Sequence, residues 1–260
     1  MIPARGGSKG IPRKNLAILA GRPLIAYTVD AARASSGLTR VMVSTEDDEI
    51  AGVTRRLGVE VPFLRPARLA ADETPILDVL TDLVASLEQR ERYRPDILVL
   101  LQPTSPFRRA GHIDAAIDLL RSSGADSVVT VVPVPHQFTP SSLMQLQGDR
   151  LVPWTDGPPK GGHYDSGEVV SAFLVRRSGS EGGSRTGTDA PAPTRRQDKP
   201  LLFARNGPAV LAVRTDVVTG AKALYGADTR GLVMSREDSF DIDDRFDLGV
   251  AELLMASRPA

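Results

Sequence analysis

Short apolar runs alternate along this chain with longer segments whose apolar residues recur at helical spacing. Apolar side chains at 76, 80, 83, 84 and 87, for example, mark one face of a helix that follows Pro75. Helices are predicted to begin at Pro23, at Asp47, after Pro75, at Gly111, near Asp216 and at Asp244, and strands to span 40–45, 59–64, 97–101, 127–132, 209–213 and 232–235. The alternation holds to about residue 134 and resumes near residue 209.

One of these strands, residues 97–101, is apolar at every position and lies between Pro95 and Pro103. Such a run is typical of a strand that helices cover on both faces, as in parallel sheets. Alternating strands and helices also imply right-handed crossovers between neighbouring strands. The pattern therefore predicts an α/β fold, a Rossmann-like three-layer sandwich with a mainly parallel sheet.

Between Pro133 and Pro200 the pattern changes to Pro, Gly, Ser and polar residues. Residues 178–194 contain four glycines and no large apolar side chain, which is typical of a mobile loop, whereas 169–175 is apolar enough to form a strand. We therefore predict an α/β domain made of residues 1–134 and 201–260. The intervening residues 135–200 are predicted to be an irregular insert with a flexible Gly/Ser-rich loop.

Charge and composition narrow the classes of partner. With 32 basic and 32 acidic residues, the chain has no net charge and no electrostatic footprint for nucleic acid or an anionic membrane. The absence of cysteine excludes disulfides, thiolate nucleophiles and Cys-based zinc sites. No signal peptide and no bilayer-spanning apolar run is visible, so a cytoplasmic protein with small-molecule partners is expected.

A basic, glycine-rich loop occupies residues 3–15 and places Arg5, Lys9, Arg13 and Lys14 among three glycines. Glycines let successive backbone N–H groups turn inward as an anion-binding nest, while the cations neutralise phosphate charge. The Gly-Lys-Ser/Thr ending of a Walker loop is missing. Composition alone is equally compatible with a flexible basic tail. Because only Met1 and Ile2 precede the loop, the first strand is expected to be a stub, or Met1 an internal start.

The order of residues in this loop resembles the signature of the acylneuraminate cytidylyltransferase, or CMP-sialic acid synthetase, family. Its members also activate legionaminic, pseudaminic and related nine-carbon acids. In that family the arginine, serine and lysine of the loop hold the triphosphate of CTP, and the closing asparagine lies against the nucleotide. The resemblance therefore implies nucleotide contacts from Arg5, Gly7, Ser8, Lys9, Lys14 and Asn15.

Two further segments extend the resemblance. The first is Leu64-Arg65-Pro66, which is followed by Asp72. In the family, the arginine at the position of Arg65 approaches the nucleotide. An arginine at a strand end is also commonly a surface charge. Gln102 follows the buried strand 97–101 at its carboxyl end, where open α/β sheets bind ligands. By resemblance Gln102 faces the sugar or nucleotide; its alternative is a loop glutamine bonded to nearby backbone.

A third segment carries the residues that the resemblance assigns to the acidic sugar. These are Arg196, Gln197, Arg205 and Asn206, with Arg195 beside them. Arginine presents a fork that matches a carboxylate, but a solvated basic patch is equally compatible with this composition. The Asn-Gly-Pro-Ala sequence that begins at Asn206 is closer to legionaminate-type members than to sialic acid enzymes.

The last segment, Asp241-Ile242-Asp243, precedes the final predicted helix. On extended backbone, the two-residue spacing directs both carboxylates to one side, where they can share a hard cation such as Mg²⁺. An Asp-x-Asp before a helix is also commonly a capping sequence, but Asp244 or Asp247 can fill that role here. The family uses this pair as its metal site.

Together the resemblance implies a nucleotidyltransferase-type fold with a small dimerisation extension, and a homodimer. The implied reaction is Mg²⁺-dependent transfer of CMP from CTP to an acidic nonulosonic sugar, with release of pyrophosphate. Arg5, Lys9, Asp241 and Asp243 would be the catalytic residues. Two alternatives stay open: a different acidic acceptor, or a catalytically silent nucleotide-binding or oligomerisation module of the same fold.

Overall fold

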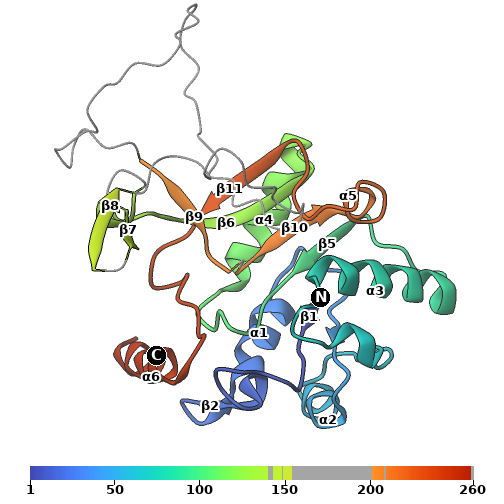
Figure 1. Cartoon of the computed structure of the whole chain (residues 1–260). Coiled ribbons are helices and arrows are strands. Elements are labelled where there is room, and N and C mark those ends of the chain that lie inside the picture. Colours follow the sequence, from blue (N-terminus) through green and yellow to red (C-terminus); the bar gives the residue numbers. More distant parts are fainter. Residues whose placement is uncertain (140–142, 148, 154–200, 208, 259–260) are drawn as a thin grey trace, which may run out of the picture. The chain divides into compact units, whose positions relative to one another are not determined.

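The computed structural model describes residues 1–139, 143–147, 149–153, 201–207 and 209–258 (Figure 1). Contacts divide the chain into two compact units, one of Met1–Val132 with Arg205–Ala260 and one of Pro133–Ala204. The predicted mobile loop 178–194 and the predicted strand 169–175 lie outside the described residues.

The first unit contains a sheet of order β11-β6-β10-β5 and a two-stranded parallel sheet β1-β4, which hydrogen bonds of Met1 place beside β5. Its strands are β1 (Ile2–Pro3), β4 (Val43–Ser44), β5 (Ile97–Leu100), β6 (Ser127–Pro133), β10 (Leu211–Arg214) and β11 (Thr229–Val233). β1 joins β5 through two bonds: the Met1 amino group donates to the Val99 carbonyl (2.6 Å), and the Leu101 N–H donates to the Met1 carbonyl (3.0 Å). This spacing is that of parallel neighbours.

The predicted mainly parallel sheet is confirmed, with one exception. β1 pairs in parallel with β4, and β11 in parallel with β6. β10 runs antiparallel to both β5 and β6, between which it lies. The apolar run of β10 is the same whichever way the strand points, so its direction was not readable from the sequence pattern.

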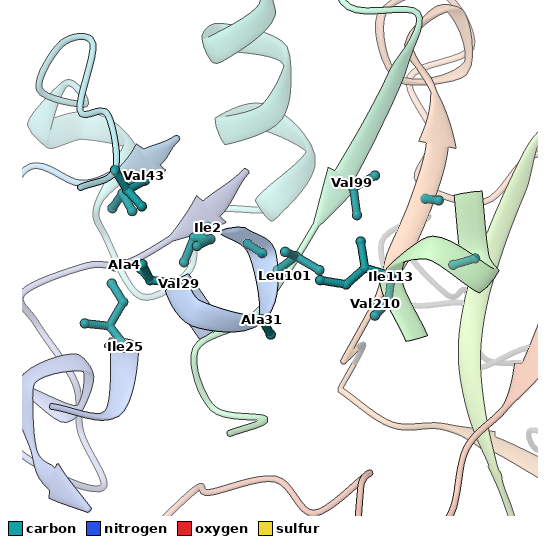
Figure 2. Close-up of a cluster of buried hydrophobic side chains, with 14 of the residues drawn as sticks. Ile2, Ala4, Ile25, Val29, Ala31, Val43, Val99, Leu101, Ile113 and Val210 are labelled. Atoms are coloured by element: carbon teal, nitrogen blue, oxygen red, sulfur yellow. The ribbon is translucent and has the colours of Figure 1, made fainter. Parts of the chain in front are cut away.

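One face of the sheet is covered by α1 (Leu24–Arg33), α2 (Asp48–Arg56) and α4 (Ala110–Ser123). Figure 2 shows this cluster, in which Ile25 and Val29 of α1 and Ile113 of α4 meet side chains of four strands. The strand residues are Ile2, Val43, Val99 and Ala212. All these side chains are buried, and each fully buried valine or isoleucine contributes about 1.5–3 kcal/mol of transfer free energy.

The other face is covered by α3 (Ile76–Glu91) and the short helix α5 (Thr215–Thr219). Val79, Leu83 and Leu87 of α3 pack with Leu98 and Leu100, the β5 residues that point away from α4. Alternate residues of β5 therefore enter two different cores, which explains why the run 97–101 is apolar throughout. With helices on both faces, the predicted three-layer arrangement is confirmed.

A third, smaller core holds the last helix, α6 (Arg245–Ser257), against the segment that follows β1. That segment contains the 3-10 helix η1 (Lys14–Leu16) and a small antiparallel pair, β2 (Ile18–Leu19) with β3 (Arg22–Pro23). Ile11 and Leu19 from this segment pack with Ile242 and Ala251. This core therefore brings the basic loop and the acidic segment 241–243 together, although they lie at opposite ends of the chain.

In the second unit, the described residues form the 3-10 helix η3 (His136–Phe138) and a hairpin of β7 (Met144–Gln147) and β8 (Arg150–Pro153). The Val134 N–H donates to the Leu202 carbonyl at 2.8 Å, close to where β9 (Phe203–Arg205) begins. Several large apolar side chains of this unit are exposed, among them Phe138, Leu146 and Leu151.

Some predicted boundaries were wrong. The helix predicted from about Asp216 to Tyr225 ends at Thr219. There the α-helical bonding pattern stops, because the Ala221 N–H bonds the carbonyl of Asp216, five residues back, at 3.3 Å. The strand predicted at 59–64 is reduced to a single bridge between Met42 and Glu60. The 3-10 helix η2 (Ala67–Leu69), which no pattern indicated, follows it.

Candidate active site

The basic loop leaves β1 at the carboxyl end of the parallel strands and is held closely on both sides. A Cβ atom at Gly10 would lie 2.4 Å from the carbonyl oxygen of Asp243, and one at Gly6 would lie 2.5 Å from Oδ2 of Asp47. A side chain at Gly10 would therefore force two backbone segments apart, and one at Gly6 would displace the side chain of Asp47. The Gly6 N–H donates to Oε1 of Glu46 at 2.7 Å. The glycines thus permit close packing of the loop, in addition to the nest that the sequence predicts.

A cavity of about 480 Å³ opens beside this loop. It contains many of the residues that the sequence singles out, namely Arg5, Ser8, Lys9, Lys14, Asn15, Arg65, Asp72, Gln102 and Asp243. Leu69, Ile76, Val79 and Pro103 supply an apolar wall. One end of the cavity is therefore cationic and polar, and another part is apolar enough to receive a flat ring.

Two loop cations share one carboxylate. Lys9 Nζ lies 2.9 Å from Oδ2 of Asp72, and the Arg5 guanidinium forms an ion pair with the same side chain. The hydrogen bond and charge of Asp72 raise the pKa of Lys9, and those of Lys9 and Arg5 lower the pKa of Asp72. The two side chains thus converge on one anionic oxygen pair, as they would on a phosphate group.

Lys14 and Asn15 connect this loop to its surroundings. Lys14 Nζ donates to the Ile242 carbonyl at 2.9 Å and lies 3.5 Å from Oδ1 of Asp243. Asn15 is buried, and its Nδ2 donates to the Arg5 carbonyl at 2.9 Å. The η1 turn therefore fixes both the backbone of Arg5 and the acidic segment across the cavity.

Arg65 is buried and paired, and its partner was missed at the sequence level. Its Nη2 lies 2.6 Å from Oε2 of Glu46, and its backbone N–H donates to the Thr45 carbonyl at 2.8 Å. Glu46 also receives the Gly6 N–H, so a single carboxylate joins Arg65 to the phosphate loop. Glu46 stands just beyond the carboxyl end of β4, a position that could have suggested it as a site residue.

Glu46→Ala is expected to lower the free energy of unfolding by about 3 kcal/mol, because it leaves the Arg65 charge buried without its partner. Glu49→Ala is the matched control: its carboxylate is exposed in a pair with Arg13, so its loss is expected to change stability by less than about 1 kcal/mol. Urea denaturation of both variants measures the difference. Equal stability of the two would contradict the framework role of the Glu46 pair.

A second buried cation lies under the loop after β5. Arg108 donates to the carbonyls of Gln102 (3.1 Å) and Ser105 (3.2 Å) and to Oγ1 of Thr28 (2.6 Å). Burial lowers the pKa of Arg108 to about 9, although the negative charge of Asp241 acts to raise it. Arg108 thus shapes the turn that places the Gln102 side chain in the cavity, and no pattern in the sequence marked it.

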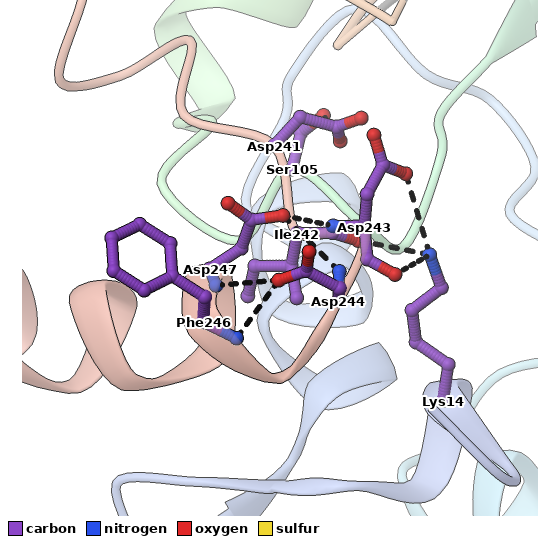
Figure 3. Close-up of polar contacts among 8 residues, drawn as sticks. All are labelled: Lys14, Ser105, Asp241, Ile242, Asp243, Asp244, Phe246 and Asp247. Carbon is purple, nitrogen blue, oxygen red and sulfur yellow. Dashed lines mark hydrogen bonds and ion pairs between the residues drawn. The ribbon is translucent and has the colours of Figure 1, made fainter. Parts of the chain in front are cut away.

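The acidic segment lies opposite the cationic loop. Figure 3 shows the carboxylates of Asp241 and Asp243 on the same side of the segment. Ser105 Oγ donates to Oδ1 of Asp241 at 3.2 Å. Burial, and to a lesser extent the charge of Asp243, raise the pKa of Asp241. A divalent cation would relieve both effects, so the two residues present fit a hard metal ion.

The start of α6 uses other carboxylates. Asp244 Oδ1 accepts from the N–H groups of Phe246 (2.8 Å) and Asp247 (3.0 Å), and Asp247 Oδ2 accepts from the N–H of Asp243 (2.9 Å) (Figure 3). The side chain of Asp243 is 81% exposed and takes no part in the cap. Among the described residues, no group of three or more His, Cys, Asp and Glu side chains is placed to hold a metal. The remaining ligands would therefore come from phosphate oxygens and water.

Several predicted site residues do not line the cavity, among them Asp241, although its carboxylate lies on the same side of its segment as that of Asp243. Gly7 is exposed in the loop and outside the cavity lining. The Arg205 guanidinium stacks 4.4 Å from the ring centroid of Tyr225, and Asn206 is buried in hydrogen bonds with protein groups. Arg196 and Gln197 lie outside the described residues, as does Arg195. No helix in the part of the chain that the structure describes is long and apolar enough to span a membrane.

Comparison with known proteins agrees with this geometry. A family model described as "Cytidylyltransferase" matches residues 1–145. A CMP-N,N'-diacetyllegionaminic acid synthase of Legionella pneumophila is 39% identical over 98% of this chain and 94% of its own length. An N-acylneuraminate cytidylyltransferase of Streptococcus agalactiae is 29% identical over 95% of this chain, which corresponds to 50% of the streptococcal protein.

The fold is shared with a solved structure of CMP:2-keto-3-deoxy-manno-octonic acid synthetase complexed with CTP. The TM-score is 0.62 at 16% identity, and the match covers 98% of this chain and 96% of that one. The family match spans more than half of the chain, and the Legionella relative is similar over nearly its whole length. On these grounds, the chain belongs to the cytidylyltransferase family.

Proposed function

We propose that this protein transfers CMP from CTP to an acidic nonulosonic sugar, with a legionaminic-type acid as the first candidate acceptor, and releases pyrophosphate. The observation that carries this proposal is that Arg5, Lys9 and Asp243 line the same cavity. The similarity to the Legionella legionaminic acid synthase, higher than that to the streptococcal N-acylneuraminate enzyme, supports the choice of acceptor.

The residues of the cavity suggest how the reaction proceeds. The anomeric hydroxyl of the sugar would attack the α-phosphorus of CTP in line, and pyrophosphate would leave towards Arg5 and Lys9, which stabilise its charge. Asp241 and Asp243 would hold Mg²⁺, which when bound offsets the charge that develops on the phosphate oxygens. Gln102 offers a donor and an acceptor for the nucleotide or sugar from the end of β5.

A pyrophosphate-release assay tests the proposal. Each of CTP, UTP, ATP and GTP is combined with N,N'-diacetyllegionaminic acid, N-acetylneuraminic acid and 2-keto-3-deoxy-manno-octonic acid in the presence of Mg²⁺. Of the four nucleotides, we expect only CTP to support pyrophosphate release. Of the three acids, we expect the legionaminic acid to give the highest kcat/KM. CTP-dependent release with another acid only would replace the acceptor. If the protein bound CTP but released pyrophosphate with none of the three acids, the catalytically silent alternative would be favoured.

We also propose a homodimer assembled through the Pro133–Ala204 unit. Its described part exposes Phe138, Leu146 and Leu151, each about 60% or more accessible, and exposed apolar groups of this kind mark interaction surfaces. Closed two-fold dimers are the commonest assembly of soluble proteins.

Light scattering is expected to give twice the mass of one chain for the wild type, and a lower mass for the double variant Leu146→Glu with Leu151→Glu. The control is Leu253→Glu, which places the same charge at an exposed leucine of α6 in the other unit and should leave the mass unchanged. A fully active monomer would contradict the proposed dimer.

A further inference from the structure

The side-chain amide of Asn206 is fully engaged within the protein. It is 7% exposed, and its Oδ1 accepts from Thr130 Oγ1 at 2.7 Å. Its Nδ2 donates to Ser239 Oγ at 2.8 Å and also lies 3.6 Å from the sulfur of Met234. Both sides of the amide are therefore taken by protein partners, and no group remains to bind a ligand directly.

Asn206 connects the central sheet to the segment that bears the acidic pair. Thr130 belongs to β6, and its Oγ1 also accepts the Val210 N–H at 3.0 Å, so its position is fixed by the sheet. Ser239 precedes Asp241 by two residues and is itself buried. The amide thus bridges a rigid strand and the beginning of the 239–243 segment.

The next residue, Gly207, lies close to the carboxylate of Asp241. Its φ of +96° lies in the region that favours glycine, and a Cβ atom there would lie 3.3 Å from Oδ2 of Asp241. The Asn-Gly pair therefore affects the acidic segment in two ways: Asn206 bonds Ser239, and the missing side chain of Gly207 leaves the space that the Asp241 carboxylate needs.

The far end of the same segment has its own supports. The Ile242 N–H donates to the Thr104 carbonyl at 2.9 Å, and Lys14 donates to the Ile242 carbonyl. The Ser239 end is also held locally, because the Ser239 N–H donates to the Ser235 carbonyl at 3.0 Å, and Ser105 contacts Asp241 directly. Asn206 adds the bond that ties this end to β6, so its loss would loosen the Ser239 end relative to the sheet.

From these contacts we infer that Asn206 is a positioning residue for the Asp241–Asp243 pair and does not contact the sugar acid. This departs from the role that the sequence resemblance implies for Asn206. It rests on the proposed function in one respect, namely that the aspartate pair holds the catalytic cation. A misplaced carboxylate would weaken the binding of that cation and lower turnover, whereas binding of the sugar would be unaffected.

The test compares Asn206→Ala, Ser239→Ala and Ser127→Ala in the full-length protein. Ser239→Ala removes only the acceptor hydroxyl of the bridge. Ser127→Ala is the matched control, because it deletes a buried hydroxyl that pairs with Thr229 (2.8 Å) at the opposite end of β6. Pyrophosphate release is measured against Mg²⁺ at saturating CTP and sugar, and against sugar at saturating Mg²⁺. Binding of Mn²⁺ in the presence of CTP is followed separately by electron paramagnetic resonance.

For Asn206→Ala we expect kcat to fall about ten- to a hundredfold and the half-saturating Mg²⁺ concentration to rise about tenfold, with the KM for sugar within about twofold of wild type. Ser239→Ala should shift the Mg²⁺ dependence in the same direction by a smaller factor, and Ser127→Ala should leave it unchanged. Weaker Mn²⁺ binding in the first two variants would support the inference without reference to turnover.

A raised KM for sugar with unchanged Mg²⁺ and Mn²⁺ behaviour would overturn it and restore the sugar contact. A fall in melting temperature alone, without a change in cation dependence, would reduce Asn206 to a residue of general stability and also overturn it. If wild type released no pyrophosphate with any acid, the proposed function would fail, and the Mn²⁺ titration of the same variants would still decide the positioning role.

Discussion

Asp243→Asn is expected to reduce turnover by about two to four powers of ten while leaving the melting temperature nearly unchanged. The side chain of Asp243 is 81% exposed, lines the cavity and takes no part in the cap of α6, so asparagine removes the charge of the proposed metal ligand without removing a capping bond. Lys14, 3.5 Å from Oδ1, would still find the Ile242 carbonyl at 2.9 Å. Steady-state kinetics at saturating CTP and Mg²⁺, with calorimetry on the same sample, measure both quantities.

Asp244→Ala is the companion variant with the opposite expectation. Asp244 accepts two backbone N–H groups at the start of α6, so its loss should lower stability by about 1 kcal/mol, equivalent to about 2–4 °C in melting temperature. The turnover of Asp244→Ala should stay within a few fold of wild type, because Asp241 and Asp243 are the proposed metal ligands. Near-normal activity of Asp243→Asn at saturating Mg²⁺ would remove the metal role from this residue.

Lys9→Ala is expected to raise the KM for CTP and lower kcat/KM about ten- to a hundredfold, with the fold intact. The Lys9 side chain is 77% exposed at the cavity and forms an ion pair with Asp72, so the core does not depend on it. The Asp72 carboxylate contacts the Lys9 ammonium group at 2.9 Å, as a phosphate oxygen of CTP is proposed to do. Initial rates at limiting CTP report the change.

The matched control is Arg13→Ala, which removes another cation of the same loop. Arg13 Nη2 contacts Asp47 and Glu49 at 2.8 Å each, on the side of α2, and Arg13 is not part of the cavity lining. Its loss should leave the KM for CTP unchanged within about twofold and slightly weaken the first turn of α2. If both variants lost the same activity, the loop would act through its overall charge and the specific role of Lys9 would fail.

The third core explains why these two predictions concern one site. Ile11, Leu19 and Phe107 pack with Ile242 and Ala251, which fixes the end of the chain against its beginning. Lys14 then crosses from η1 to the carbonyl of Ile242. Hydrophobic packing supplies the attraction between the two segments, and one charge-assisted hydrogen bond sets their register.

Local order and composition determined much of this protein in advance. The apolar run of β5, the face of α3 and the alternation of elements predicted the three-layer α/β fold, because burial on one or two faces leaves a period in the sequence. The order of cations and glycines in residues 3–15 and the Asp241-Ile242-Asp243 spacing predicted part of the cavity lining, namely Arg5, Ser8, Lys9, Lys14, Asn15 and Asp243. Both are short motifs whose chemistry depends on neighbours in the chain.

Only the tertiary structure decided the features that depend on partners distant in sequence. The antiparallel direction of β10, the pairing of Arg65 with Glu46, the buried Arg108 and the bridge from Thr130 through Asn206 to Ser239 join residues 19 to 80 positions apart or strands whose order no pattern encodes. The identity of an asparagine or arginine in the sequence does not show whether its side chain binds a ligand or another part of the protein. Which of these it does depends on what the fold places within hydrogen-bonding distance, and that information is absent from the local sequence.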